Sequence, residues 1–177
     1  MRFTTIAGTM FTGMLVLIIA ACSKQDIKKI QEIMKKELPE PKYIVTINSI
    51  VKYPRAKELE KEIDTFTGRK IWINTNSFVH AKSIEEVKLV PRDKLGNFYD
   101  LELKLSNHGK LIWMQLSTAY SYKKLAFVVD GVFYRSFIAK PMKDDDDYAL
   151  VEGPFDKSTA EQIKKYAETN FEYFNQR

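Results

Sequence analysis

Residues 125–138 hold the feature that most constrains the fold: the pair Asp130-Gly131 lies between two runs of apolar, β-branched and aromatic side chains. Asp-Gly in this setting is typical of a two-residue type I′ turn, because both turn residues adopt positive φ. The pattern therefore predicts the central β-hairpin of a sheet. Few side chains in it are polar, so other elements must cover at least one of its faces.

Other strands are expected on both sides of this hairpin. Residues 43–51 are rich in β-branched side chains, and residues 71–73 and 148–151 form short apolar runs. Residues 99–105 alternate apolar and polar side chains, which predicts a half-buried antiparallel strand. A turn is expected at residues 93–97.

The first half of the chain also contains two helix patterns. Ala56, Leu59 and further apolar residues up to position 66 share one helical face, and Gly68 would end that helix. Ser83 and Glu86 have the spacing of a capping box, which predicts a short helix through Val87.

Two longer helices are expected in the second half. Asn107 can cap the first, and Ser158 with Glu161 forms a second capping box that opens the last helix. Gly153-Pro154 predicts a turn before it. The apolar face expected for the last helix consists of Ile163, Tyr166, Ala167, Phe171 and Phe174. This mixture of strands and helices predicts an α+β domain with helices on one face of a mostly antiparallel sheet.

The N-terminus resembles a bacterial lipoprotein signal peptide. Arg2 is followed by an apolar stretch at residues 10–20 and by Ala21-Cys22, which matches a lipobox with cleavage between these two residues. The resemblance implies that residues 1–21 are removed and that Cys22 carries a diacylglyceryl group and further acylation such as palmitate. Two or three acyl chains make a stable membrane anchor. A plain secretory leader, or a transmembrane helix with an incidental Cys22, is the alternative.

Residues 22–41 are expected to form a tether, with helical spacing that ends at Pro39 and Pro41. The same lysine-rich segment could instead lie on anionic lipid as an amphipathic helix. The folded domain would span residues 42–177, and residues 42–73 could form a lobe of their own. The expected location is the periplasm or cell exterior, at the outer membrane in a Gram-negative host because Ser23 follows the cysteine.

Residues 83–174 resemble the periplasmic head subdomain of SecD and SecDF, membrane proteins that assist protein export. The matching features include the short capped helix predicted at Ser83–Val87, an amphipathic strand, a helix start at Gly109, the run from Lys124 to Gly131 and the later Gly153-x-Phe155. The resemblance implies a ferredoxin-like, SecD-head-like α+β fold, no enzyme activity and a role in handling an emerging polypeptide. The acidic residues 144–147 replace a glycine-rich segment of the family, and the family's export-channel transmembrane helices are missing.

Composition and motifs speak against several classes of function. The net charge of +5 is spread over mixed Lys/Glu surface without a basic stripe, so no nucleic-acid partner is expected. His80 and His108 are far apart in sequence, nucleophile motifs are absent, and no catalytic residue or cofactor is expected. Residues 144–147 lack the spacing of a Ca²⁺ loop, so no metal site is expected either.

The sequence thus favours a non-enzymatic, lipid-anchored module that binds a peptide or protein, as an accessory of protein export or envelope assembly. Phe133, Tyr134, Arg135 and Phe137 are the candidate binding surface, since a hairpin edge can pair with an extended peptide. Ordinary cross-strand packing is the alternative for each of them. An immunity or sequestering lipoprotein that captures a toxic peptide or protein is the alternative function, followed by a metal-binding or enzymatic lipoprotein.

Overall fold

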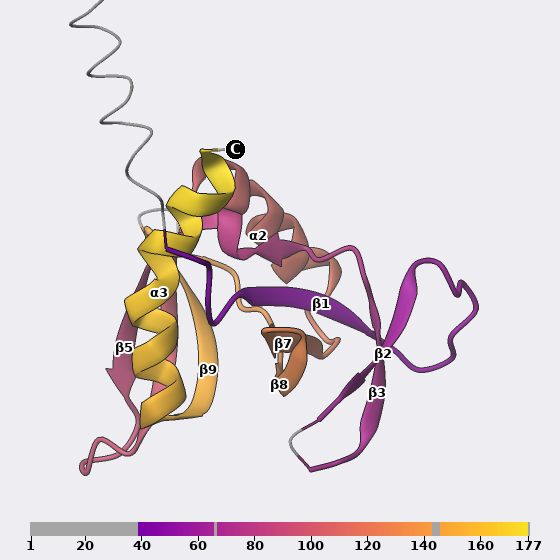
Figure 1. Cartoon of the computed structure of the whole chain (residues 1–177), viewed down its shortest axis with the longest axis horizontal. Helices are drawn as coiled ribbons and strands as arrows, with labels where there is room; N and C mark the ends of the chain where they lie inside the picture. The colour runs from indigo at the N-terminus through magenta and orange to yellow at the C-terminus, as the bar shows by residue number, and fades with distance from the viewer. Residues whose placement is uncertain (1–38, 66, 143–145, 177) are drawn as a thin grey trace, which may run out of the picture. The chain divides into compact units, whose positions relative to one another are not determined.

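A computed structural model describes residues 39–65, 67–142 and 146–176. Predictions for the signal peptide, for Ala21 and Cys22 and for the tether up to residue 38 lie outside this range. The described residues form one compact unit, Pro39–Arg177. Its strands make two antiparallel sheets, and helix α3 (Lys157–Asn175) runs along one of them (Figure 1).

The first sheet has the strand order β2-β3-β1-β7-β8, and short β4 also pairs with β1. Strand β1 lies at its centre, because it pairs with β3 near its end and with β7 over most of its length. The strands are β1 (Val45–Val51), β2 (Glu60–Asp64), β3 (Lys70–Asn74), β4 (Val79–His80), β7 (Leu125–Val129) and β8 (Val132–Phe137).

The second sheet has the order β5-β6-β9, built from β5 (Ile84–Pro91), β6 (Phe98–Leu105) and β9 (Tyr148–Asp156). Leu101, Leu103 and Leu105 of β6 are all buried on one face, as their alternation predicts. The opposite face carries charged side chains, and Lys88 lies over the ring of Tyr148 there. One face of this sheet is therefore core and the other meets solvent.

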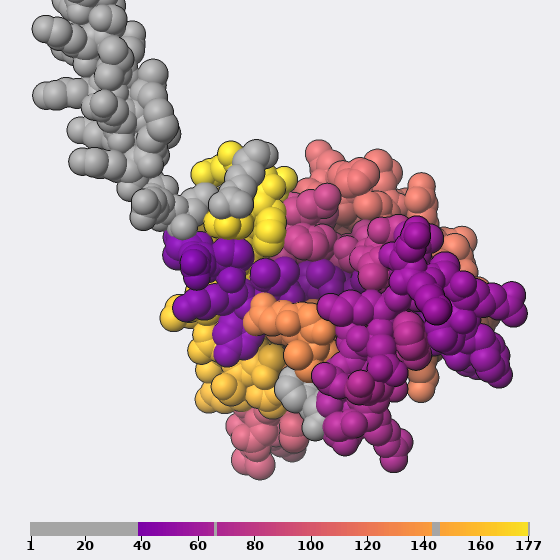
Figure 2. Space-filling view, turned by 45° about the vertical axis from the view of Figure 1, so that its right-hand side comes forward, coloured from indigo at the N-terminus to yellow at the C-terminus, as the bar shows by residue number. Residues whose placement is uncertain are grey.

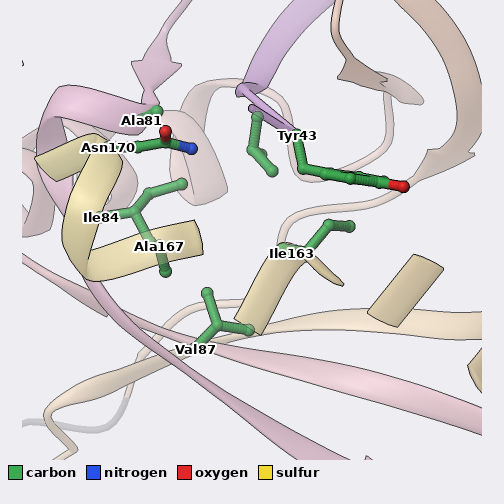
Figure 3. Close-up of a pocket in the computed structure, with 8 residues that line it drawn as sticks. Tyr43, Ala81, Ile84, Val87, Ile163, Ala167 and Asn170 are labelled. Carbon is green, nitrogen blue, oxygen red and sulfur yellow. The ribbon is translucent and has the colours of Figure 1, made fainter. Parts of the chain in front are cut away.

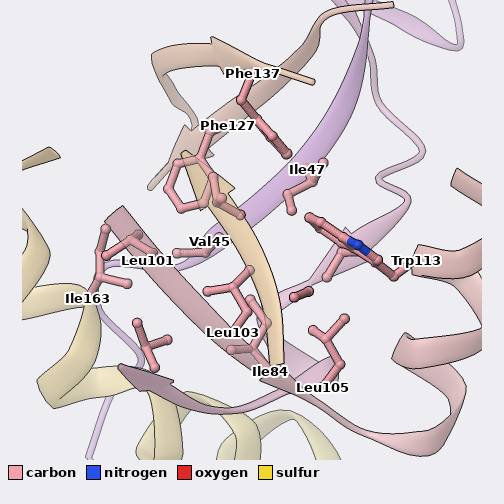
Figure 4. Close-up of a cluster of buried hydrophobic side chains, with 14 of the residues drawn as sticks. Val45, Ile47, Ile84, Leu101, Leu103, Leu105, Trp113, Phe127, Phe137 and Ile163 are labelled. Atoms are coloured by element: carbon pink, nitrogen blue, oxygen red, sulfur yellow. The ribbon is translucent and has the colours of Figure 1, made fainter. Parts of the chain in front are cut away.

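The main core lies between the two sheets, α3 and helix α2 (Asn107–Ala119) (Figure 4). Val45, Ile47 and Phe127 enter it from the first sheet, and Trp113 enters it from α2. Trp113 is fully buried, and its indole nitrogen donates to the carbonyl oxygen of Lys140 at 2.9 Å. A buried indole with its hydrogen bond satisfied ties α2 to the segment after β8.

A smaller core supports the hairpin of β2 and β3, the arm at the right of Figure 1. Ile63 and Ile73 of the arm pack there with Ala126 and Val128 of β7. An isolated bridge between Thr65 and Phe133 links the base of the arm to β8. Residues 45–51 thus belong to the main domain, and the arm packs against it.

The α+β fold with antiparallel sheets is confirmed, and so is the hairpin at Asp130-Gly131. Asp130 has φ 49° and Gly131 φ 80°, as the type I′ turn requires. The strands predicted at residues 43–51, 71–73, 99–105 and 148–151 are present, as is the turn at residues 93–97. In that turn the Asp93 carboxylate accepts from the amides of Asn97 and Phe98.

The helix predicted from Ala56 to position 66 is wrong, because strand β2 occupies the end of that segment. Ile63 is buried in the small core, whereas Leu59 is exposed. Gly68, with φ 74°, belongs to the tight turn between β2 and β3 and not to a helix end. Pairing with β3 provides backbone hydrogen bonds and a core contact that an isolated helix would lack.

The helix predicted from Ser83 to Val87 is also wrong. A short 3-10 helix, η1 (Ala81–Ser83), ends at Ser83, and β5 begins at Ile84. Ile84 and Val87 are both buried, and a bulge in the pairing with β6 lets both face the core. Tertiary packing therefore overrides the capping-box pattern.

The caps of the long helices lie slightly upstream of the predicted positions. Ser106, not Asn107, accepts the hydrogen bond from the Gly109 amide at the start of α2. Asp156, not Ser158, accepts from the amide of Thr159 at the start of α3. The caps predicted from sequence are thus displaced by one and two residues.

Gly153-Pro154 lies inside β9 and does not form the predicted turn. The pairing of β6 with β9 is irregular at this point. A Cβ atom at position 153 would lie 2.0 Å from the carbonyl oxygen of Tyr99. Only glycine allows the two strands to approach so closely here.

Candidate binding groove

The four side chains expected to form a binding surface on β8 divide between two regions of the domain. Phe137 is buried in the main core, where its ring packs against Trp113 and Phe127. Phe133 is half-buried and packs against the small core under the arm. Figure 2 shows the region of this hairpin, in orange, reaching the surface between the indigo start of the domain and the magenta arm.

Tyr134 and Arg135 connect β8 to β9. The Tyr134 ring stacks on Phe155, and its hydroxyl donates to the Asp156 carboxylate. The Arg135 guanidinium also lies over the Phe155 ring, 5.3 Å from its centroid, and donates to the carbonyl oxygen of Pro154 at 2.8 Å. These side chains bridge the two sheets, so an incoming strand would have to displace them.

Electrostatics at this bridge favour a charged Asp156. Burial alone would raise the pKa of Asp156, but hydrogen bonds from Tyr134 and from Thr159 hold it below its usual value. Burial, together with the hydrogen bond to Asp156, raises the pKa of Tyr134. The pair therefore persists as phenol and carboxylate at neutral pH.

A second feature is that side chains hold residues 39–44, which we call the leading segment, by hydrogen bonds. The Asp130 carboxylate accepts hydrogen bonds from the amides of Tyr43 and Ile44, at 3.1 and 2.7 Å. Asn170 of α3 is buried and bonds both backbone groups of Lys42. Asp130 thus has a role beyond turn geometry, which the sequence pattern did not predict.

Beneath Tyr43 lies a small apolar cavity of about 10 Å³ between β5 and α3 (Figure 3). Val87, Ile163 and Ala167 line its inner side, and the Tyr43 ring stacks on Tyr166. The volume is that of about one water molecule and the walls are apolar. The cavity is a packing gap under the leading segment and is too small for a ligand.

A much larger groove, of about 390 Å³, opens where three separate segments meet. They are the stretch from Ser77 through η1, the first turns of α2 and the C-terminal end of α3, which lie side by side in Figure 1. We call it the histidine groove; its lining residues are Ser77, Phe78, His80, Lys82, Ser83, His108, Ile112 and Phe174. Both histidines of the chain are among them.

The position of His80 in this groove is fixed on two sides. Its Nδ1 accepts a hydrogen bond from the Lys82 amide at 3.1 Å, which places the proton of the neutral ring on Nε2. Its ring meets that of Phe174 edge to face, with 4.7 Å between the centroids. Burial, and secondarily the nearby Lys82 charge, lower the pKa of His80, so the ring is neutral at pH 7.

The walls of the groove combine apolar and polar groups. Phe78, whose ring also packs against Tyr120 at 5.0 Å, and Ile112 provide half-buried apolar surface. Lys82 and His108 are exposed at its rim. In the described part of the chain, His80 accepts its hydrogen bond from the Lys82 amide, and the groove as a whole is a concave site with apolar walls and a polar rim.

The acidic run at residues 144–147 lies partly outside the described residues. Asp147 is exposed and pairs with Lys110 of α2 at 2.6 Å, which lowers the pKa of this carboxyl. Among residues 39–65, 67–142 and 146–176, no group of three or more His, Cys, Asp or Glu side chains could hold a metal ion. No helix in the same residues is long and apolar enough to cross a membrane.

Comparison with known proteins shows the fold. No protein-family model matches the chain, and no curated protein matches it in sequence. A crystal structure of SecDF in a super-membrane-facing form is 14% identical, with a TM-score of 0.51 over 73% of this chain and 19% of that chain. A structure of SecDF described as a membrane component that enhances protein export is also 14% identical, with a TM-score of 0.50 over 78% of this chain and 67% of that chain.

At this identity the similarity concerns the fold alone. The domain is SecD-head-like, as the sequence resemblance implied, and it corresponds to 19% of the length of the first SecDF structure. The histidine groove was not predicted, because its residues come from three segments. The one signal in the sequence was that His80 and His108 are the only histidines.

Proposed function

We propose that this protein is a lipid-anchored, extracytoplasmic binding module without enzymatic activity. It engages a peptide or protein as an accessory of protein export or envelope assembly. The observation that carries the proposal is the open histidine groove, with apolar walls formed by Phe78 and Ile112 and a polar rim. Its volume lies in the range of sites that bind small ligands or peptide side chains.

Two further observations support the proposal. The lipobox-like sequence ending at Ala21-Cys22 is compatible with membrane attachment outside the cytoplasm. The fold is similar to part of SecDF, which is described as enhancing protein export. A fold can serve many functions, so the partner has to be identified by experiment.

Crosslinking in cells followed by capture of the tagged protein tests the partner. Recovery of translocon or envelope-assembly proteins is the expected result. Recovery of a single toxic peptide or protein would instead support the immunity function. Recovery of neither would contradict both.

The anchor is tested separately by Cys22→Ser. We expect this variant to leave the membrane fraction or to remain uncleaved, because the acylated thiol is missing. Mass spectrometry of the mature N-terminus of the unaltered chain should show cleavage before Cys22 and added acyl groups. Membrane attachment of a cleaved Cys22→Ser protein would contradict the lipoprotein assignment.

A further inference from the structure

The lining of the histidine groove has an unbalanced charge. Lys82 carries a positive charge, the His108 ring can donate a hydrogen bond to an anion, and none of the eight lining residues is acidic. Elsewhere on the described surface, lysines commonly face carboxylates, as Lys104 faces Glu85 and Lys140 faces Glu152. The groove therefore offers positive groups without internal partners of opposite charge.

The backbone around the groove adds to this positive potential. His108 lies in the first turn of α2, where the helix dipole places partial positive charge. That first turn contains no acidic residue, although aspartate and glutamate are favoured there. The start of α2, which is capped by the neutral Ser106, and the side chains of Lys82 and His108 thus favour the same kind of group, an anion.

The apolar walls show that an inorganic anion would use only part of the site. Phe78, Ile112 and Phe174 present half-buried apolar surface next to the cationic groups. A ligand that fills the groove therefore needs an apolar side chain and a carboxylate within one short stretch. A concave site of this kind fits an extended polypeptide segment better than the flat headgroup layer of a bilayer.

The geometry points to the histidine groove as the docking site for an acidic, apolar segment of a protein partner. This inference rests on the proposed binding function and names the chemistry of the partner. Carboxylates of the segment pair with Lys82 and His108 at the rim. Its apolar side chains pack on Phe78 and Phe174.

Fluorescence anisotropy can test this with the chain from Ser23 to Arg177, which contains both hydrophobic cores. The probe is a short labelled peptide in which glutamate alternates with leucine. Its charge-reversed counterpart, in which lysine alternates with leucine, is the matched control. We expect saturable binding of the glutamate peptide and none of the lysine peptide.

The variant Lys82→Glu/His108→Glu should weaken binding of the glutamate peptide about tenfold or more, since one exposed ion pair and one hydrogen bond are replaced by repulsion between carboxylates. Both residues are exposed, so the fold should be unaffected. Lys94→Glu, in the turn between β5 and β6, reverses the same kind of charge at the opposite end of β5 from η1, outside the groove lining, and should leave binding unchanged. Phe174→Ala, checked for folding by its melting temperature, should also weaken binding.

Three results would overturn the inference: equal binding of both peptides, an equal loss with Lys94→Glu, or binding to anionic phospholipid vesicles without binding to the glutamate peptide. A cellular partner that is still captured by Lys82→Glu/His108→Glu would exclude the groove as its site but leave the binding-module proposal standing. If no partner is captured while the glutamate peptide binds, the groove chemistry holds and the proposed cellular function fails.

Discussion

The β8 strip and the histidine groove differ in where their side chains point and in how they are assembled. Phe133, Tyr134 and Arg135 are near neighbours in sequence, and all contact other parts of the fold. The groove takes its residues from segments that are up to 97 positions apart, between Ser77 and Phe174, and their side chains remain accessible together. The aromatic residues along β8 pack within the fold, whereas the open groove forms where segments distant in the sequence meet.

The largest effect that separates the two regions should come from Phe137→Ala. Removing this buried ring leaves a cavity beside Trp113 and should lower the free energy of unfolding by about 3–5 kcal/mol. His108→Ala, at the exposed rim of the groove, should change it by less than about 0.5 kcal/mol. Urea unfolding measures both. Similar losses of unfolding free energy in the two variants would contradict the distinction between a β8 side chain that supports the core and a groove side chain that does not.

Substitutions in the bridge from β8 to β9 should lower the free energy of unfolding by less than Phe137→Ala does. Asp156→Ala removes both the N-cap of α3 and the partner of Tyr134, and should cost about 1–2 kcal/mol. Tyr134→Phe removes only the hydroxyl and should cost about 1 kcal/mol. In a double-mutant cycle the two losses should not add, because they share one hydrogen bond. Strict additivity would mean that the bridge does not couple β8 to β9.

Loss of the hydrogen bonds that hold the leading segment should lower the free energy of unfolding by about 1 kcal/mol, which is typical of hydrogen bonds at an exposed site. Asp130→Gly keeps the positive φ of the turn but removes the acceptor of the Tyr43 and Ile44 amides. Hydrogen exchange at these amides should accelerate. Asp130→Asn retains one side-chain oxygen and should accelerate exchange less. An equal acceleration in both variants would mean that the side-chain acceptor does not protect these amides.

The smallest expected effect is a pH dependence of stability that arises from His80. Because burial and Lys82 lower its pKa in the folded state, the unfolded chain binds the proton more readily. Stability from this group is therefore complete above the usual histidine pKa and declines as the pH falls from there toward the lower folded value. His80→Asn can preserve an acceptor for the Lys82 amide and should flatten the curve in that window.

Much of the fold could be predicted from the sequence, because local patterns coincide with it. Strict alternation identified β6, and Asp130-Gly131 identified the hairpin. Prediction failed where a pattern for one structure was outweighed by packing, as at Ile63 in β2 and at Ile84 in β5. The sequence contains no local signal for those contacts, since their partners lie on β7, β3 and β6.

The site could be predicted far less well. Phe133 and Tyr134 were expected at a surface on the hairpin edge; β8 does end its sheet, but the polar groups of Tyr134 and Arg135 are engaged by Asp156 and Pro154 of β9, a contact without a local signal. His80 and His108 were not expected to share a site, because they lie 28 positions apart in the sequence. Convergence of β4, η1 and α2 depends on the topology of the whole domain, which short-range patterns do not encode.

The hydrogen bonds of Asp130 and Asn170 also have a mechanical consequence. A pull on the chain at Pro39 reaches the domain first at Lys42, Tyr43 and Ile44, which are held by two side chains from distant parts of the sequence. Strand β1 pairs with β7 immediately afterwards, beginning at Val45. A load applied at Pro39 therefore meets contacts to α3 and to the β7–β8 turn before it reaches the first paired residue of β1.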